Sequence, residues 1–465
     1  MNFSSYQLPQ SPTRASSIET GLGSFTPPQT PREADSTRGL PRVDDEQGGP
    51  LDASFRFSKA ALAAPARPGL RRQVDVENAE SGDYVMVIGG LGYIGSHTTL
   101  ELLKEGLNVV VVDDLSNSYL NVLSRIRRLA EKYCVARDMV QPQLRFHNMD
   151  YRSAEMHSLL FRYASSRTKI SGVIHFAAFK SVSESIARPL AYYRNNICGL
   201  IELLTTMQEV GIKNFVFSSS ATVYGEEANA GKPLQEDDLV HFNQTNTDDI
   251  GNVTILLNGA RGLTSPYGRT KYFAEAILAD VAHADPSIRI TALRYFNPVG
   301  CHPSGILRED PRQKPTNLFP VIASVMKGSQ NELEIFGTDW STRDGTAIRD
   351  FIHVMDLAQG HIAALVAASP VVNPKREAFR AYNLGSGTGM TVAEVVSSFE
   401  KASNLKVPVV LAPRRDGDVG FCVAATSRAE TELGWKTTKR VEDCAKDTWN
   451  ATLLECAAGK YDLTG

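Results

Sequence analysis

Tyr267 and Lys271 are the side chains whose spacing first suggests catalysis. They lie four residues apart in the segment Ser265–Lys271, which places them on one face at the start of a predicted helix. An unperturbed tyrosine has a pKa of about 10 and is a weak base near neutral pH. A nearby ammonium group favours the phenolate, which can then take a proton from an alcohol. An exposed tyrosine and a surface lysine are the alternative interpretation.

A run of hydroxyl side chains supplies a second part of this chemistry. Residues 218–225 read Ser-Ser-Ser-Ala-Thr-Val-Tyr-Gly and directly follow a predicted strand over Asn214–Phe217. Ligands of open α/β sheets bind at the carboxyl ends of the strands. A hydroxyl there can donate a hydrogen bond to a substrate oxygen as that oxygen becomes a carbonyl. The alternative is an ordinary serine-rich turn.

A glycine-rich turn predicts where a dinucleotide would bind. Gly89, Gly92 and Gly95 follow the predicted strand Tyr84–Ile88 and open a helical pattern. Without side chains, the backbone turns sharply and approaches a pyrophosphate, whose charge the helix N-terminus stabilises. Asp113 ends the next predicted strand, where an acid accepts hydrogen bonds from the adenosine ribose. An ordinary tight turn is the alternative for the glycines alone.

The charges around Asp113 indicate which dinucleotide is bound. Asp114 follows Asp113 and no arginine adjoins them, so a 2'-phosphate would meet two carboxylates. The sequence therefore favours NAD over NADP. Asp150, near the end of the third predicted strand, either contacts the adenine or caps the helix ahead of Ser153–Glu155.

The segments that carry these residues alternate between strands and helices. Continuous apolar runs, typical of strands buried on both faces, occupy 84–88, 108–112, 172–176, 214–217 and 289–293. The alternation predicts an α/β fold with a Rossmann-like, doubly wound parallel sheet. We expect a disordered extension over 1–82, an NAD-binding Rossmann domain over 83–298 and a smaller α/β C-terminal substrate domain over 299–465, partly interleaved with the first.

The composition excludes several classes of partner. The 465 residues carry a formal net charge of -3, so no overall field attracts nucleic acid or anionic lipid. Six widely spaced cysteines without a C-x-x-C pair indicate neither a metal site nor a disulfide framework and fit a reducing compartment. We expect a cytoplasmic protein without a membrane span.

The first 80 residues differ from the rest of the chain. They hold 9 of the 23 prolines, together with many serines and threonines, and cannot bury enough apolar surface to fold. Ser-Pro and Thr-Pro pairs within them are candidate sites for a proline-directed kinase. The basic stretch 55–72 either meets a partner or membrane surface or is a solvated linker.

Several longer segments resemble the extended short-chain dehydrogenase/reductases, and among them the UDP-glucose 4-epimerases. The similarity runs from about Tyr84 to Trp449 and covers both predicted domains. The segments are GGLGYIGSHT from Gly89, SSSATVYG from Ser218, SPYGRTK from Ser265, LRYFNPVG from Leu293, DGTAIRDFIHVMDLA from Asp344, YNLGSGTGMT from Tyr382 and RRDGDVGFC from Arg414.

The resemblance implies an enzyme of galactose metabolism that interconverts UDP-glucose and UDP-galactose. Bound NAD would take a hydride from carbon 4 of the sugar, and the 4-keto sugar would turn and take it back on the opposite face. Tyr267 would remove the proton of the 4-hydroxyl, Ser220 would hydrogen-bond the 4-oxygen, and Lys271 would bind the nicotinamide ribose. The resemblance also implies a homodimer, with helices within residues 182–210 at its interface.

The resemblance further implies contacts to both ligands. The cofactor contacts are Gly89, Gly92, Tyr93, Ile94, Gly95, Asp113, Asn117, Ser118, Asp150, Tyr151, Phe176, Ala177, Lys180, Asn195, Ser218, Tyr267, Lys271 and Tyr295. The contacts to the UDP-hexose are Lys180, Ser220, Ala221, Thr222, Tyr267, Asn297, Asn317, Leu318, Phe336, Arg349, Arg415, Asp418 and Cys422. Arginines suit a diphosphate and an aspartate suits a ribose diol. The alternative interpretation of these residues is that Arg349 pairs with Asp350 and that residues 414–416 form a solvated turn.

The chain departs from the family pattern at four places. Ile88 replaces a threonine before the double glycine, and Tyr151 replaces a smaller residue beside the adenine, where its ring either fits poorly or contacts the base. Residues 226–264 are longer than usual and predict a surface insertion, with a lid or partner site as the alternative. Cys422 stands where the family has a tyrosine or a small residue. A small side chain leaves room for an N-acetyl group, so UDP-N-acetylglucosamine and UDP-N-acetylgalactosamine are expected substrates.

Three other functions share parts of this pattern. A sugar-nucleotide 4,6-dehydratase or decarboxylase typically needs an acid after the strand-end serine or threonine, where this chain has Ala221 and Thr222. A UDP-glucuronate epimerase would hold a sugar carboxylate, and no extra basic residue adjoins Ser220 or Tyr267 in the sequence. A non-catalytic NAD-binding sensor or regulatory paralogue is the alternative from another class, although a sensor has no need of the three catalytic side chains.

Overall fold

The computed structural model describes residues 82–461, apart from 248, 249, 251, 311, 313, 314, 371, 416 and 417. Nearly all of the predicted N-terminal extension, with its candidate phosphorylation sites and its basic stretch, lies outside the described residues.

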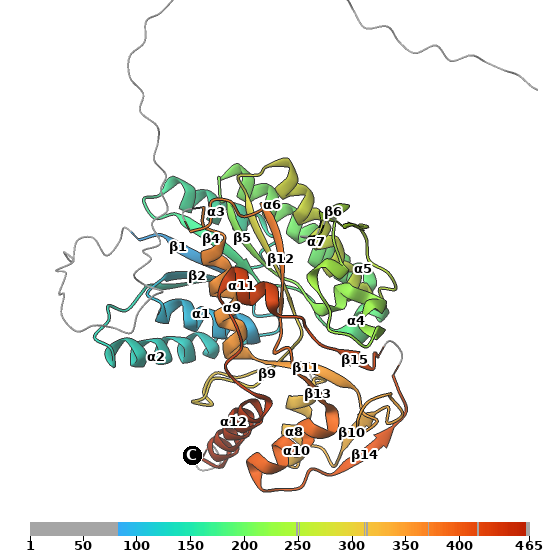
Figure 1. Ribbon diagram of the computed structural model, residues 1–465. Coiled ribbons are helices and arrows are strands. Elements are labelled where there is room, and N and C mark those ends of the chain that lie inside the picture. Colours follow the sequence, from blue (N-terminus) through green and yellow to red (C-terminus); the bar gives the residue numbers. More distant parts are fainter. Residues whose placement is uncertain are drawn as a thin grey trace, which may run out of the picture. The chain divides into compact units, whose positions relative to one another are not determined.

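A seven-stranded parallel sheet forms the centre of the described chain (Figure 1). Its strand order is β12-β8-β5-β4-β1-β2-β3, and every neighbouring pair is parallel. The strands are β1 (Tyr84–Ile88), β2 (Asn108–Asp113), β3 (Leu144–Asn148), β4 (Ile170–His175), β5 (Asn214–Ser218), β8 (Arg289–Tyr295) and β12 (Phe379–Leu384). The predicted α/β fold is confirmed, because apolar runs at this spacing form strands that are buried on both faces.

Helices cover both faces of this sheet (Figure 1). One face packs against α1 (Tyr93–Lys104), α2 (Asn121–Val135), α9 (Val354–Ala367) and α11 (Ser427–Leu433). The other face packs against α3 (Ala154–Ser165), α6 (Gly199–Glu209) and α7 (Pro266–Ala284). Between β4 and α6 the chain forms α4 (Val182–Ala187), α5 (Pro189–Tyr193) and the π-helical turn η3 (Arg194–Cys198).

The C-terminal half builds a smaller set of strands and helices. Its strands are β9 (Asn297–Val299), β10 (Leu333–Phe336), β11 (Ile348–His353), β13 (Gly389–Thr391), β14 (Val409–Ala412) and β15 (Phe421–Cys422). They pack with α8 (Leu318–Met326), α10 (Val392–Ser403) and α12 (Val441–Tyr461) around a separate core. Because β12 of this half completes the main sheet, the two halves are interleaved, and the division at residue 299 stays a prediction.

The long segment before α7 is only partly a surface insertion. It contains η4 (Ala221–Asn229), η5 (Glu236–Asp238) and a hairpin of β6 (Gln244–Thr247) and β7 (Val253–Leu256). Leu234 and Leu239 are buried, and the Leu234 amide donates to the Val423 carbonyl over 2.9 Å. The start of the segment therefore belongs to the core, and the exposed part is the hairpin, where Val253 and Ile255 face solvent.

Among the described residues, no helix combines the length and apolar character that crossing a lipid bilayer requires.

Candidate active site

The tyrosine and lysine of the predicted catalytic pair lie at the start of α7. The Ser265 hydroxyl accepts a hydrogen bond from the Gly268 amide over 3.1 Å, and Pro266 takes the first helical position. The helix therefore begins where the sequence predicts. Tyr267 is 9% exposed and Lys271 is 3% exposed, so the alternative of an exposed surface pair is wrong.

Burial shifts the pKa of both side chains. It raises the pKa of Tyr267 to about 12, although a hydrogen bond with Ser220 lowers it in part. It lowers the pKa of Lys271 to about 7, while the charge of Glu275 acts in the opposite direction. The Lys271 ammonium donates to the Ser218 carbonyl over 2.6 Å and lies 6.0 Å from the centroid of the Tyr267 ring. In this structure the ammonium is therefore turned toward Ser218 and lies beside the Tyr267 ring.

The three serines at the end of β5 have different partners. Ser218 shares a hydrogen bond with the Tyr295 hydroxyl, and Ser219 donates to Glu275. Ser220 begins η4 and accepts from the Thr222 hydroxyl over 3.1 Å, and its hydroxyl also interacts with Tyr267. Ser220 is thus the serine that the fold brings to the tyrosine, which supports its predicted role.

A buried ionic network, which the sequence interpretation missed, lies one turn beyond Lys271. Glu275 is fully buried, and its Oε2 lies 2.7 Å from Arg294 Nη2 and 3.0 Å from His241 Nε2. Burial alone would raise the pKa of Glu275, but Arg294 and a hydrogen bond from His241 hold it well below its usual range. With the Ser219 contact, this network joins α7 to the end of β5. The sequence feature that could have pointed to Glu275 is its spacing from Tyr267 and Lys271, because the three residues share one helical face.

The glycine-rich turn has the geometry that a pyrophosphate requires. A Cβ at Gly95 would lie 2.1 Å from the Gly89 carbonyl oxygen, and Gly89 has a φ of +78°, so both positions require glycine. Gly92 is the N-cap of α1, no side chain caps the helix, and its first turn has no acidic residue. The first amides of α1 and its positive end are therefore suited to bind an anion.

Asp113 ties this turn to the loop after β2. Its Oδ2 accepts from the Leu91 amide over 2.9 Å, and its Oδ1 accepts from the Ser118 hydroxyl over 2.7 Å. Burial raises the pKa of Asp113, while these hydrogen bonds lower it in part. The carboxylate sits beside the glycine turn, as binding an adenosine ribose requires, so the described residues fit a dinucleotide.

The other residues predicted to contact the cofactor gather at one edge of the main sheet. Most follow the carboxyl ends of its strands: Asn117 and Ser118 after β2, Asp150 and Tyr151 after β3, Phe176, Ala177 and Lys180 after β4, and Tyr295 at the end of β8. Tyr93 and Ile94 start α1, and Asn195 lies in η3. Lys180 forms an ion pair with Glu309 over 3.3 Å, and Asn117 is exposed.

The structure corrects one alternative at the end of β3. Asp150 does not cap α3, because Ser153 is the N-cap residue and Asp150 forms an ion pair with Arg152 instead. The Tyr151 ring is buried and lies edge-on against His175 with a centroid distance of 5.0 Å. The Tyr151 hydroxyl donates to the Asn195 carbonyl. The extra bulk of Tyr151 is thus accommodated in the core.

The predicted substrate residues lie mainly at the ends of β9, β10, β11 and α8. Asn297 begins β9, Asn317 and Leu318 start α8, and Phe336 ends β10. The Arg415 guanidinium lies 4.5 Å from the centroid of the Phe336 ring and forms an ion pair with Asp418. These aromatic, basic and acidic groups are the types that a nucleoside diphosphate requires.

One of the two alternatives for this half is corrected. Arg349 does not pair with Asp350, because Asp350 accepts hydrogen bonds from the Ser386, Gly387 and Ala424 amides. In the segment 414–416, Arg414 and Arg415 are exposed, as a solvated turn requires, and Arg414 lies 3.6 Å from the centroid of the Trp340 ring and pairs with Asp339. Residue 416 lies outside the described residues.

Cys422 lies opposite Arg349 in the pairing of β11 with β15. It packs against the apolar cluster that contains Ala221, the neighbour of Ser220. Burial raises the pKa of the Cys422 thiol to about 11, so the side chain is small and neutral near pH 7. The fold therefore places Cys422 on the side of the substrate half that meets the catalytic strand end.

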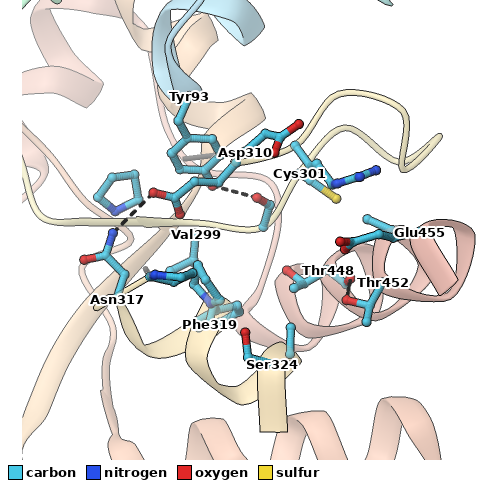
Figure 2. A pocket seen from close by; sticks show the side chains of 18 of the residues that line it. Tyr93, Val299, Cys301, Asp310, Asn317, Phe319, Ser324, Thr448, Thr452 and Glu455 are labelled. Atoms are coloured by element: carbon cyan, nitrogen blue, oxygen red, sulfur yellow. Dashed lines mark hydrogen bonds between the residues drawn. The ribbon is translucent and has the colours of Figure 1, made fainter. Parts of the chain in front are cut away.

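A cavity of about 220 Å³ lies between α8, α12 and the segment after β9 (Figure 2). Tyr93 donates to the Gly300 carbonyl over 2.6 Å at its edge, and Asn317 donates to Glu309 over 3.5 Å. Neither Tyr267 nor Ser220 lines this cavity, so it is distinct from the catalytic strand end.

Within the described residues, no group of three or more His, Cys, Asp or Glu side chains is arranged to hold a metal ion. All six cysteines are free.

Comparison with known proteins supports the same interpretation. A family model described as GDP-mannose 4,6 dehydratase matches residues 86–448. UDP-glucose 4-epimerase 2 of Arabidopsis thaliana is 44% identical over 366 residues, which cover 79% of this chain and 94% of that protein. The structure of UDP-glucose 4-epimerase from Bifidobacterium longum with NAD+ and UDP has a TM-score of 0.68 and 38% identity, covering 80% of this chain and 99% of that one. The Stenotrophomonas maltophila UDP-glucose-4-epimerase with NAD and formylated UDP-arabinopyranose has a TM-score of 0.69 and 39% identity, covering 81% and 99%.

Proposed function

The chain belongs to the UDP-glucose 4-epimerase family, within the wider family of the GDP-mannose 4,6 dehydratase model, and on this premise we propose that it interconverts UDP-glucose and UDP-galactose with NAD as cofactor. The observation that carries the proposal is the placement of Ser220, Tyr267 and Lys271. All three are buried at the end of β5 and the start of α7. The glycine turn that fits a dinucleotide follows β1 at the same edge of the sheet.

Each catalytic side chain has a defined part in the reaction. The glycine turn and Asp113 would hold NAD, which would supply reversible hydride transfer at carbon 4 of the sugar. Tyr267, as the phenolate, takes the proton of the sugar 4-hydroxyl and becomes the neutral phenol, which later returns that proton to the same oxygen. Ser220 donates a hydrogen bond to the same oxygen while it is a carbonyl. Lys271, whose ammonium lies 6.0 Å from the centroid of the Tyr267 ring, supplies the positive charge that favours the phenolate.

Substrate binding falls to the C-terminal half. We propose that Arg349 and Arg415 hold the diphosphate and that Asp418 accepts hydrogen bonds from the uridine ribose. Phe336 and the start of α8 at Asn317 supply the uracil end of this site. In the structure, Arg415 and Asp418 pair with each other, so nucleotide binding would exchange this exposed ion pair for contacts to the ligand.

The other enzyme activities are less well supported by the site. Ala221 and Thr222 follow Ser220, so the acid that a dehydratase places there is absent from these positions. A regulatory protein that only binds NAD has no use for a buried tyrosine and lysine whose pKa values are shifted in opposite directions. The 4-epimerase reaction uses all three side chains.

The direct test is to incubate the purified full-length chain with UDP-galactose without added NAD. We expect UDP-glucose to form, and we expect NAD to be recovered from the protein after acid extraction. Absence of turnover in a chain that carries NAD would contradict the proposal and favour the sensor function. Conversion of UDP-glucuronate with no conversion of UDP-galactose would favour the other epimerase activity.

Cys422→Tyr is expected to narrow the range of substrates. The native thiol is small, whereas a tyrosine would occupy the volume that an N-acetyl group on carbon 2 requires. We expect kcat/KM for UDP-N-acetylgalactosamine to fall by about 100-fold, while kcat/KM for UDP-galactose changes by less than about fivefold. Cys422→Ser, which keeps the side chain small, is the control. A wild-type enzyme confined to the unacetylated sugars would contradict the prediction.

We also propose a homodimer, formed through the helices between β4 and β5. Four apolar side chains on α4, α5 and α6 are exposed: Val182, Ile186, Leu190 and Ile201. A second copy that covers them would remove this apolar surface from water. The molar mass in solution checks this proposal.

A cytoplasmic location fits the six free cysteines, and imaging of the tagged protein in cells would test it.

A further inference from the structure

Arg312 of the C-terminal half contacts the cofactor half at the loop after β2. Its Nε donates a hydrogen bond to the Ser118 carbonyl over 2.9 Å. Its guanidinium lies 4.4 Å from the centroid of the Tyr119 ring. A planar guanidinium combines both contacts well, since it donates in its plane and stacks through its face. Arg312 thus holds this loop by two independent interactions.

Two neighbouring acids make further contacts between the halves. Asp310 forms an ion pair with Arg125 of α2 over 3.2 Å. Glu309 forms an ion pair with Lys180 over 3.3 Å. Lys180 belongs to the predicted ligand-binding residues, whereas Asp310, Arg125 and Arg312 do not. Glu309, Asp310 and Arg312 therefore contact the cofactor half at three separate places.

The loop that Arg312 holds also forms one wall of the dinucleotide site. The Ser118 hydroxyl and the Leu115 amide both donate to Asp113 Oδ1, over 2.7 Å and 3.0 Å. Asp113 Oδ2 accepts from Leu91 in the glycine turn. A dinucleotide bound at Asp113 and at the N-terminus of α1 would therefore lie between the glycine turn and this loop.

We propose that Arg312 and Asp310 are positioning residues that retain the cofactor. From the substrate half, they fix the loop Leu115–Tyr119 and the start of α2, and the dinucleotide dissociates only after these contacts open. The proposal rests on the proposed function, because it takes the dinucleotide at Asp113 to be NAD. It concerns the lifetime of the bound cofactor and leaves the chemical step to Ser220, Tyr267 and Lys271.

The charges of these contacts give retention a salt dependence. The side chains of Arg125 and Asp310 are 22% and 33% exposed, so dissolved ions screen their attraction. The contacts of Arg312 depend less on ionic strength, because its partners, the Tyr119 ring and the Ser118 carbonyl, are uncharged. Release of NAD from the wild-type protein is therefore expected to accelerate with ionic strength, and Asp310→Asn is expected to weaken that acceleration.

The experiment measures the rate at which the full-length chain, purified with NAD, loses it in the presence of an enzyme that consumes free NAD. Arg312→Gln and Asp310→Asn each remove one contact, and the double variant removes both. We expect release to be about tenfold faster in Arg312→Gln and about threefold faster in Asp310→Asn. The double variant is expected to be faster than either. With saturating NAD, kcat for UDP-galactose is expected to stay within about twofold of the wild-type value.

Control variants separate retention from a general loss of structure. Arg308→Gln removes the same charge from the same segment, but Arg308 donates to Gly305 of its own half. We expect this variant to release NAD at the wild-type rate. Tyr119→Leu removes the ring that Arg312 contacts, and it is expected to accelerate release in the wild-type background but little further in Arg312→Gln.

Two results would overturn the inference. Release from Arg312→Gln and Asp310→Asn at the rate of Arg308→Gln, with epimerase activity intact, contradicts the retention role and leaves the proposed function standing. A wild-type chain that carries no NAD and converts no UDP-galactose contradicts both.

Discussion

Tyr267→Phe is expected to lower kcat for UDP-galactose by about 1,000-fold or more, because it removes the group that transfers the proton of the 4-hydroxyl. The substitution deletes one oxygen and keeps the ring, which is buried at the start of α7. The fold and the binding of both ligands should therefore persist. Steady-state kinetics and the NAD content of the purified variant measure the two effects separately.

A matched control lies on the same helix. Tyr272 follows Lys271 directly, and its ring packs near His241 with a centroid distance of 5.5 Å. Tyr272→Phe is expected to keep kcat within about threefold of the wild-type value, since its hydroxyl has no part in the reaction. Equal activity of Tyr267→Phe and Tyr272→Phe would show that the proton is transferred by another group. Loss of bound NAD from Tyr267→Phe would show that the hydroxyl serves cofactor binding instead.

Glu275→Ala is expected to lower the free energy of unfolding by about 3–5 kcal/mol, because it leaves the Arg294 guanidinium buried without a counter-charge. Arg294 is 1% exposed, and its other partners are the Tyr224 hydroxyl and the carbonyls of Glu236 and Leu239. None of these is charged. Unfolding by urea, followed by tryptophan fluorescence or circular dichroism, measures the change.

An exposed ion pair provides the comparison for Glu275. Glu455 pairs with Lys327 over 3.2 Å at the surface, and Glu455→Ala is expected to cost less than about 1 kcal/mol. Similar losses of unfolding free energy in the two variants would contradict the assigned importance of the buried network.

The buried pair of Glu275 and Arg294 also makes the stability of the wild-type protein depend on pH. Because the folded-state pKa of Glu275 lies below its ordinary value of 4.5, the contribution of the pair is full above that value and is lost as the pH falls.

The network around Glu275 also affects catalysis through the backbone. Ser219 donates to Glu275, and Ser220 follows it directly. Lys271 on the same helix holds the Ser218 carbonyl. The three serines are therefore fixed from α7, which keeps Ser220 at a constant position relative to Tyr267. For this reason Glu275→Ala should lower kcat as well as stability.

The sequence by itself determined the features that depend on neighbours in the chain. Apolar runs predicted β1, β2, β4, β5 and β8, because strands buried on both faces of a parallel sheet contain few polar residues. The glycine spacing predicted the turn before α1, since contact between Gly95 and Gly89 leaves no room for side chains. The segment Ser265–Lys271 predicted the start of α7, and the resemblance supplied the family to which the chain belongs.

The tertiary structure decided what depends on residues that are distant in the chain. Asp150 pairs with Arg152 and does not cap α3, as local pattern had allowed, and the Tyr151 ring is packed against His175. Leu234 and its neighbours turn the predicted insertion partly into core. No local pattern indicates that Glu275 meets Arg294, because their pairing requires α7 to pack on the sheet.

The surroundings of Asp113 show most clearly the difference between what the sequence determines and what the fold decides. In the sequence, no arginine adjoins Asp113, and this absence favoured NAD. In the structure, Arg312, about 200 residues away, contacts Ser118 and Tyr119 of the loop that Asp113 holds. Electrostatic and stacking interactions act through space, so the charge around a site is a property of the folded chain. The sequence determined that a dinucleotide site exists, and the fold decided which side chains close it.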